Sequence, residues 1–309
     1  MEQGIILKST GSWYKVKSTK GDIVDCKIVG KLRMSDLRST NPISVGDKVD
    51  FERESDLIGV INNIHERKNY LIRKSSNLSK ESHIVAANID WCYLVVTVNY
   101  PKTMLAFIDR FLVTAEAYRI PVKIIFNKID LYNDEDFVAL EEWEAIYNTI
   151  GYQTFRLSTT TGENIEQLKS QLSDTISLFS GNSGVGKSSI INKLDTSLSI
   201  KTHELSKGHK KGTHTTTFAE MYETSNGGYI VDTPGLKGFG LLRMEEQEIS
   251  HYFPEMFRLL KDCSFHNCTH VHEPNCAVQR AVSNGEISFS RYENYISMLE
   301  DLKQDRYRR

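Results

Sequence analysis

The chain up to about residue 74 consists of short stretches in which apolar and polar residues alternate. Such alternation, interrupted by glycines and other turn residues, is typical of strands with one face in a core. Several short strands at this close spacing favour a small β-barrel, and the oligonucleotide-binding (OB) barrel is one such fold. The predicted strands are residues 5–8, 13–18, 23–28, 48–52 and 58–64.

After residue 74 the pattern changes to nearly continuous apolar stretches that alternate with segments of helical periodicity. Strands that are apolar on both faces, with helices between them, indicate a parallel sheet covered by helices on its two sides. We therefore expect an α/β fold in this part of the chain. The predicted strands are residues 89–98, 122–126, 153–157, 175–179 and 229–231, and the predicted helices are 105–118, 137–150 and 165–172.

The pattern of strands ends at about residue 242, and a helix is predicted over residues 288–306. Apolar side chains recur at helical spacing along it, so we expect one face of this helix to pack against another element. These side chains are Tyr292, Tyr295, Ile296, Leu299 and Leu302. The chain is thus expected to divide into a β-barrel at residues 1–72, an α/β domain at 73–242 and a mostly α-helical domain at 243–309.

The overall composition is that of an ordinary folded protein. The 309 residues allow two or more domains, and contents of 39% hydrophobic and 25% charged residues argue against disorder. The longest apolar run, residues 91–98, is far shorter than the roughly 18 residues that span a bilayer. Residues 1–8 lack the charged and apolar regions of a secretory signal. We therefore expect a cytoplasmic protein that does not associate with membranes.

Charge is distributed unevenly along the chain, whose net charge is -2. Residues 1–80 carry 15 Lys and Arg against 10 Asp and Glu, a net charge of +5. A positive β-barrel indicates nucleic acid as a partner, although a solvated basic surface is an equally good interpretation. Trp13, Tyr14 and Phe51 are able to stack on bases, but packing inside the barrel is the favoured interpretation for aromatic residues in strands.

A glycine-rich loop follows the predicted strand at 175–179. Residues 181–188 read G-N-S-G-V-G-K-S and match the phosphate loop G-x-x-x-x-G-K-[ST], with a helical stretch after them. Glycines let backbone N–H groups turn toward phosphates, and the helix start adds a favourable dipole. Lys187 is expected to hold the terminal phosphates and Ser188 to bind Mg²⁺. The predicted nucleotide contacts are Gly181, Asn182, Ser183, Gly184, Val185, Gly186, Lys187, Ser188 and Ser189.

The sequence N-K-I-D at residues 127–130 follows the predicted strand at 122–126 and indicates which base is bound. A fixed carboxylate accepts both N–H donors on the edge of guanine, which adenine lacks. Asp130 is therefore expected to select guanine, while Asn127 braces the pocket and Lys128 lies along the base.

A second loop for the base is predicted after the strand at 153–157. Residues 158–162 read S-T-T-T-G and look like the second guanine loop of GTPases, in which a backbone N–H meets the guanine oxygen. Ser158 and Thr159 are the predicted contacts, with Thr159 where alanine is usual. A polar turn leading into the next helix is the alternative interpretation.

Two segments match the switches of GTPases. The sequence D-T-P-G at residues 232–235 follows an apolar strand, so Asp232 is expected to bind Mg²⁺ through water and the Gly235 N–H to contact the γ-phosphate. Upstream, a basic loop ends in H-T-T-T at residues 214–217. A threonine there, Thr216 or alternatively Thr215, is expected to complete the Mg²⁺ shell when the γ-phosphate is present.

The guanine motifs precede the phosphate loop, whereas they follow it in ordinary GTPases. The same sheet forms if the ends of the domain are moved, because chain ends lie close together at the surface and permutation is tolerated. The pattern therefore predicts a circularly permuted P-loop GTPase core, whose second switch leads directly into the C-terminal domain.

Three of the five cysteines crowd into one short segment that also contains histidines. The spacing C-x4-C-x-H-x5-C suits one tetrahedral zinc ion, and it does not resemble a disulfide framework. We expect this zinc to be structural, since it would fold a segment too small for a core of its own. The expected ligands are Cys263, Cys268, His270 and Cys276, with His266 or His272 as alternatives to His270.

Taken together, these motifs and their order resemble the ribosome small subunit-dependent GTPase family, RsgA, over nearly the whole chain. The resemblance rests on the basic barrel, N-K-I-D ahead of G-N-S-G-V-G-K-S-S, H-T-T-T, D-T-P-G and the cysteine segment. It implies an OB fold, a zinc module, and hydrolysis of GTP to GDP in maturation of the small ribosomal subunit. The implied partners are that subunit and its rRNA, and we expect a monomer.

One departure from common GTPases concerns the attacking water. Leu236 stands where many GTPases have a glutamine that orients this water, so slow intrinsic hydrolysis is expected. We hypothesise that His214 acts in catalysis beside Lys187 and Thr216, and a solvent-exposed loop histidine is the alternative. A second hypothesis for the whole chain is a nucleotide-regulated RNA-binding module with negligible turnover.

Overall fold

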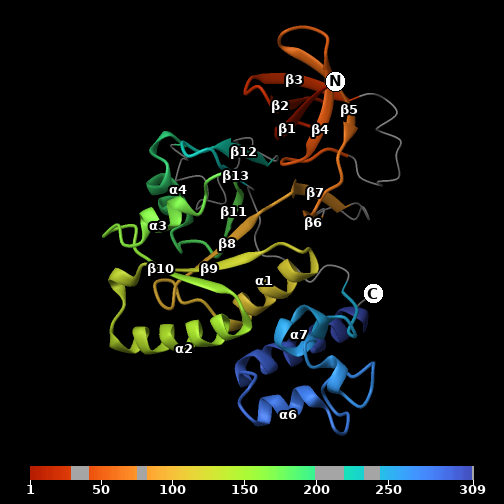
Figure 1. The fold of residues 1–309 in the computed structure, drawn as a ribbon. Helices are drawn as coiled ribbons and strands as arrows, with labels where there is room; N and C mark the ends of the chain where they lie inside the picture. The colour runs from red at the N-terminus through yellow and green to blue at the C-terminus, as the bar shows by residue number, and fades with distance from the viewer. Residues whose placement is uncertain (29–41, 75–81, 199–218, 233–243, 308–309) are drawn as a thin grey trace.

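The computed structural model describes residues 1–28, 42–74, 82–198, 219–232 and 244–307. Figure 1 shows a β-barrel next to the N-terminus, an α/β region in the middle and a group of helices toward the C-terminus. One sheet of 11 strands runs through the first two parts, because the barrel strand β1 pairs with β12 of the α/β sheet.

The barrel contains five strands and closes on itself. Successive strands pair in the order β1-β2-β3-β5-β4, and β4 pairs back to β1. Alternate side chains point inward, so Tyr14 and Phe51 are buried in the barrel core, as the packing interpretation predicts. Trp13 is 38% exposed, and the Lys27 ammonium lies 4.4 Å from the centre of its ring. The strands are β1 (Glu2–Ser9), β2 (Tyr14–Ser18), β3 (Ile23–Ile28), β4 (Lys48–Arg53) and β5 (Ile58–Ile64).

A two-stranded hairpin that the hydrophobic pattern did not predict follows the barrel. Its strands are β6 (Tyr70–Lys74) and β7 (Ser82–Ala87), which pair antiparallel. Gly46, which precedes β4 in the chain, lies against the end of β7. Its φ is +86°, and a Cβ atom there would lie 2.2 Å from the carbonyl oxygen of Ala87. Only glycine allows the two backbones to approach so closely.

The α/β region contains the predicted parallel sheet. Its strands lie in the order β10-β9-β8-β11-β13, all parallel, and β12 adds an antiparallel edge next to β13. The pattern did not predict β12, which has only four residues. The strands are β8 (Trp91–Val96), β9 (Val122–Asn127), β10 (Gln153–Leu157), β11 (Ile176–Ser180), β12 (Glu220–Glu223) and β13 (Tyr229–Asp232).

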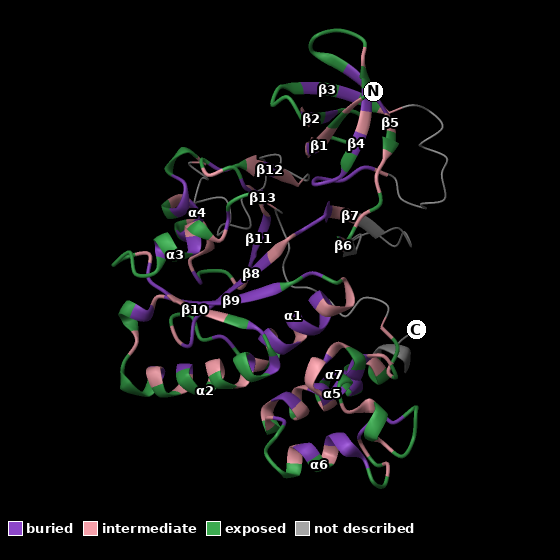
Figure 2. Ribbon diagram, in the orientation of Figure 1, coloured by how far each residue is buried: buried purple, intermediate pink, exposed green. Residues whose placement is uncertain are grey.

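Helices cover both faces of this sheet. The pair α1 (Leu105–Ala117) and α2 (Asp134–Ile150) packs on one face, and the pair α3 (Ile165–Ser170) and α4 (Lys187–Leu194) packs on the other. The central strands are consequently buried on both sides, as Figure 2 shows. Each face has its own apolar core, which explains the nearly continuous apolar stretches in the sequence.

The C-terminal part consists of short helices and one long one. Its elements are η4 (Ile249–Tyr252), α5 (Pro254–Phe257), η5 (Leu260–Asp262), α6 (Ala277–Ser283) and α7 (Phe289–Tyr307). Tyr295 and Leu299 of α7 are buried, as the helical periodicity predicts. Among the described helices, none combines the length and the apolar character needed to cross a bilayer.

A buried ionic cluster joins the C-terminal part to α1. Arg291 of α7 has a side chain that is 1% exposed, and its Nη1 donates to Asp109 Oδ1 of α1 at 2.7 Å. Its Nε donates to Glu255 Oε1 of α5, also at 2.7 Å. Two carboxylates thus compensate the burial of one guanidinium, which ties three helices together.

Candidate functional site

Four of the predicted nucleotide motifs follow strands of the parallel sheet. N-K-I-D begins at the end of β9, S-T-T-T-G follows β10, the glycine-rich loop follows β11, and Asp232 is the last residue of β13. Because the carboxyl ends of parallel strands lie at one edge of a sheet, segments far apart in the chain meet there. Such an edge is where open α/β sheets bind ligands.

The phosphate loop depends on glycines with positive φ angles. Gly181 has φ +138° and Gly186 has φ +101°. A Cβ atom would lie 2.1 Å from the Val95 carbonyl oxygen at Gly181, and 2.3 Å from Asn127 Nδ2 at Gly186. The turn therefore packs directly against the ends of β8 and β9. Its side chains differ in exposure: Val185 is buried, Asn182, Lys187 and Ser188 are half-buried, and Ser183 and Ser189 are exposed.

The ammonium group of Lys187 points back into the phosphate loop. It donates to the carbonyl oxygens of Gly181 at 2.7 Å and Asn182 at 2.6 Å. Burial lowers the pKa of Lys187, and none of the ion pairs formed by the described residues includes this lysine. A phosphate group would supply the missing counter-charge at this position.

Asn127 connects the base-reading motif to the phosphate loop. Its Nδ2 donates to the Val185 carbonyl oxygen at 2.8 Å, and its side chain is fully buried. Its Oδ1 is also buried and has no hydrogen-bond partner among the described residues. The next residue, Lys128, has φ +64° and donates from Nζ to the Tyr100 carbonyl oxygen at 2.8 Å.

The two guanine loops also contact each other. The hydroxyl group of Ser158 donates to Asp130 Oδ1 at 2.5 Å. The same hydroxyl oxygen accepts the backbone N–H groups of Thr160 at 3.2 Å and Thr161 at 3.1 Å. Asp130 is exposed, yet this network fixes the direction of its carboxylate. Thr159, between these residues, is half-buried.

Asp232 lies at the end of β13, next to the strand that leads into the phosphate loop. Burial and the neighbouring Glu220 carboxylate raise the pKa of Asp232. A carboxylate and a serine hydroxyl such as that of Ser188 are hard oxygen donors, and a divalent cation would relieve the cost of burying this charge. The predicted switch contacts Thr215, Thr216 and Gly235, together with His214 and Leu236, lie outside the described residues.

Sequence reasoning did not identify the loop after β8, which contains Tyr100 and Pro101 and lies beside the phosphate loop. The Tyr100 carbonyl oxygen accepts from Lys128, and a Cβ atom at Gly184 would lie 3.7 Å from the Pro101 ring. This loop follows β8, so the proline directly after an apolar strand was the available signal.

The structure brings the four expected metal ligands together. The ligand atoms of Cys263, Cys268, His270 and Cys276 all lie within 4.8 Å of one another. His270 presents Nδ1 to the sulfur atoms, at 3.2 Å from Cys276 Sγ and 3.7 Å from Cys263 Sγ. The alternatives His266 and His272 are exposed and do not belong to the cluster.

The spacing of these atoms fits tetrahedral zinc. With Zn–S of about 2.3 Å and Zn–N of about 2.0 Å, two ligand atoms of a tetrahedron are separated by about 3.5–3.8 Å. The two sulfur atoms of Cys263 and Cys276 are 4.0 Å apart.

Helix α7 also contacts the cysteine segment, since Tyr292 donates its hydroxyl to the His270 carbonyl oxygen at 2.7 Å. Burial raises the pKa of the Cys268 thiol, so metal binding there has to displace a proton.

Comparisons with known proteins cover nearly the whole chain. A family model described as the RsgA N-terminal domain matches residues 3–61, and one described as the RsgA GTPase matches residues 64–242. The small ribosomal subunit biogenesis GTPase RsgA of Bacteroides fragilis is 53% identical over 306 residues, which are 99% of each chain. The protein of the same name from Phocaeicola vulgatus is 51% identical over 306 residues, again 99% of each chain.

Solved structures are similar over the same extent. The crystal structure of YjeQ from Thermotoga maritima has a TM-score of 0.79 and 38% identity, covering 97% of this chain and 98% of that one. YloQ, described as a circularly permuted GTPase, has a TM-score of 0.77 and 26% identity, covering 98% of this chain and 95% of that one. The predicted order of motifs on a permuted core is thereby confirmed.

Proposed function

Since the chain belongs to the RsgA GTPase family, we propose that it hydrolyses GTP during maturation of the small ribosomal subunit. The contact from Asn127 Nδ2 to the Val185 carbonyl oxygen carries this proposal, because it places the base-reading motif against the phosphate loop. One guanine nucleotide spanning the two motifs explains why both lie at the same edge of the sheet, after β9 and β11, with only β8 between these strands.

In this proposal Asp130 accepts the N–H donors of guanine while Ser158 holds its carboxylate, and Thr159 contributes a backbone N–H. Lys187 releases the carbonyl oxygens of its own loop and binds the terminal phosphates. Ser188 and Asp232 hold Mg²⁺, the ion that neutralises developing charge on the phosphates. Gly235 and Thr216 complete the site from the two switch segments.

We also propose that hydrolysis depends on the bound subunit. Leu236 is unable to hydrogen-bond the attacking water, so another group has to orient it, and His214 is our candidate for this role. A His214→Ala variant should lose most of the turnover that small subunits stimulate while its affinity for GTP stays unchanged. Full stimulated turnover in that variant would exclude the role.

The remaining parts of the chain have supporting roles in this proposal. The cysteine cluster holds one structural zinc ion, and the positive barrel contacts rRNA. In this proposal the domains divide as 1–72, 73–242 and 243–309. The protein acts in the cytoplasm as a monomer, and its described helices include none suited to a bilayer.

Phosphate release with purified small or large ribosomal subunits tests the proposed function. We expect turnover to rise with small subunits only, and to be lost in Lys187→Ala. Equal rates with both subunits would contradict the proposed partner. Negligible turnover under every condition, with GTP-dependent binding to small subunits, would favour a nucleotide-regulated RNA-binding module instead.

A further inference from the structure

A row of charged side chains crosses from the barrel to the nucleotide site. Lys8 of β1 stands opposite Glu220 of β12, and Glu220 stands opposite Asp232 of β13. Residues directly opposite each other in antiparallel strands share one face of the sheet, with Cβ atoms about 4.5–5.5 Å apart. The row therefore places a lysine of the barrel beside a carboxylate that in turn neighbours Asp232.

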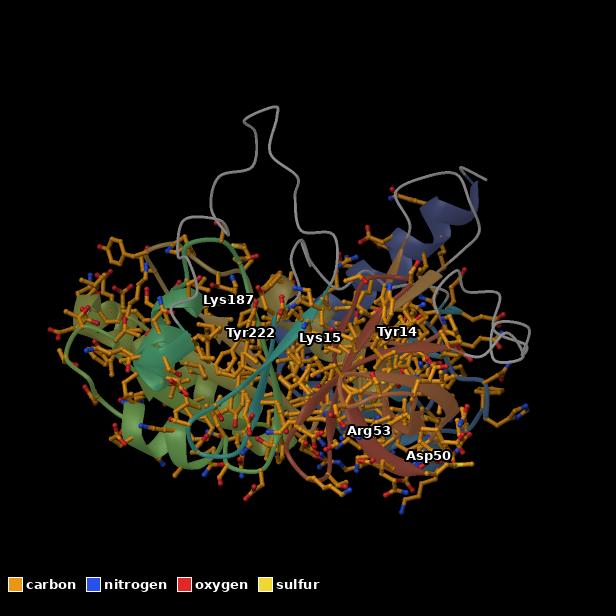
Figure 3. All side chains as sticks on the ribbon, turned by 90° about the horizontal axis from the view of Figure 1, so that it is seen from above. Tyr14, Lys15, Asp50, Arg53, Lys187 and Tyr222 are labelled. Atoms are coloured by element: carbon orange, nitrogen blue, oxygen red, sulfur yellow. The ribbon has the colours of Figure 1, made fainter. Side chains whose placement is uncertain are left out.

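Two hydrogen bonds support this row. Lys8 Nζ donates to Glu220 Oε2 at 2.9 Å, and the two side chains are 30% and 28% exposed. The hydroxyl of Tyr222 donates to the same Glu220 oxygen at 3.3 Å. In the view of Figure 3, Tyr222 lies between Lys187 of the phosphate loop and Lys15 of the barrel.

The position of β12 gives the row its significance. This strand directly joins the barrel to the α/β sheet, because it pairs with β1 on one side and β13 on the other. In the chain it lies between the two segments that the sequence identifies as switches. A change in the contacts between the barrel and β12 therefore occurs on the strand directly next to the one that carries Asp232.

We propose that Glu220 is a positioning residue for Asp232 and that Lys8 compensates the charge of Glu220. Contact between the barrel and β12 would thereby change the affinity of the site for Mg²⁺. With Lys8 in place, the charge of Glu220 is compensated. Without it, an extra carboxylate attracts a divalent cation to the site. Without the Glu220 charge, the remaining Lys8 ammonium repels the cation. This inference rests on the proposed GTPase function.

A double-mutant cycle in the full-length protein tests it. Binding of a fluorescent GDP analogue is measured across a Mg²⁺ titration for wild type, Lys8→Met, Glu220→Gln and the double variant. We expect the Mg²⁺ midpoint to fall about threefold in Lys8→Met, the size expected for one charge at two strand spacings near a surface. The midpoint should rise by more than that in Glu220→Gln, because Glu220 stands only one strand spacing from Asp232. The midpoint of the double variant should lie between those of the two single variants, because the two charge effects oppose each other.

A second ion pair between barrel and β12 provides a matched control. Lys17 of β2 pairs with Glu223 of β12, but Glu223 stands opposite Tyr229, at the end of β13 far from Asp232. Lys17→Met and Glu223→Gln should therefore leave the Mg²⁺ midpoint unchanged.

A purely structural role for the Lys8 pair predicts a different pattern. Both single variants would then shift the midpoint in the same direction, or the control variants would shift it equally, and either result would overturn the proposal. Raising the salt concentration should shrink the two opposite shifts, because salt screens partly exposed charges. Failure of the wild-type protein to bind GDP at all would count against the proposed function rather than against the charge row.

Discussion

The hydroxyl group of Ser158 donates a hydrogen bond of 2.5 Å to the carboxylate of Asp130, although 28 residues separate them in the chain. The contact joins the loop after β10 to the loop after β9. A carboxylate that is exposed but held in one direction is prepared to accept two parallel N–H donors, which is the pattern that guanine presents.

Asp130→Asn should change the base that is bound. An amide in place of the carboxylate presents a donor to guanine, and we expect the affinity for GDP to fall about 100-fold, as the loss of two charge-assisted hydrogen bonds implies. Xanthine nucleotides should then bind better than guanine nucleotides in competition experiments. The control is Glu135→Gln, which removes an exposed carboxylate in the first turn of α2. Unchanged GDP preference in Asp130→Asn would refute the assignment.

Gly186→Ala should abolish nucleotide binding. The new methyl group would lie 2.3 Å from Asn127 Nδ2, at a backbone φ of +101° that alanine adopts poorly. Gly151→Ala is a matched control, since φ is +118° there but nothing lies within 4 Å of a Cβ atom. Both variants should lose about 1 kcal/mol or more of folding stability, but only Gly186→Ala should fail to bind a GDP analogue. Wild-type affinity in Gly186→Ala would show that the close contact with Asn127 is dispensable.

Replacing a ligand of the cysteine cluster should remove bound zinc. Cys276→Ser is expected to lower the zinc content from one ion per chain to nearly none and to lower the melting temperature of the C-terminal part. Treatment of the wild type with a strong chelator should have the same effect, because structural zinc contributes to folding directly. Cys92→Ala, a buried cysteine of β8 outside the cluster, should keep its zinc. Stoichiometric zinc in Cys276→Ser would argue against this ligand set.

Arg291→Ala should destabilise the packing of α7 on α1. It leaves Asp109 and Glu255 buried without their partner, and removing one member of a buried ionic cluster costs about 3–5 kcal/mol. Arg110→Ala breaks an exposed pair with Asp301 between the same two helices and should cost less than about 1 kcal/mol. Denaturant unfolding monitored on both variants measures the difference. Similar losses in the two variants would mean that the buried cluster has no special role.

Several features of the fold were predictable because they depend on local periodicity. The barrel strands, the apolar parallel strands and helix α7 all follow from the spacing of apolar residues. The edge strand β12 was not, since Glu220–Glu223 contains two charged residues in four and a single buried one, Met221. It forms a strand because β1 and β13 provide hydrogen-bonding partners on both sides, which no local pattern reveals.

The sequence by itself determined the identity of the chemical groups: the phosphate loop, the guanine motif, the cysteine and histidine ligands, and the permuted order in which they occur. Only the tertiary structure decided which of these groups meet. It selected His270 over His266 and His272, joined Asp130 to Ser158, and placed Lys8 of the barrel beside Glu220. The physical reason is that motif chemistry depends on residue type and short spacing, whereas contacts between distant segments depend on strand order and register, which the whole chain has to fold to establish.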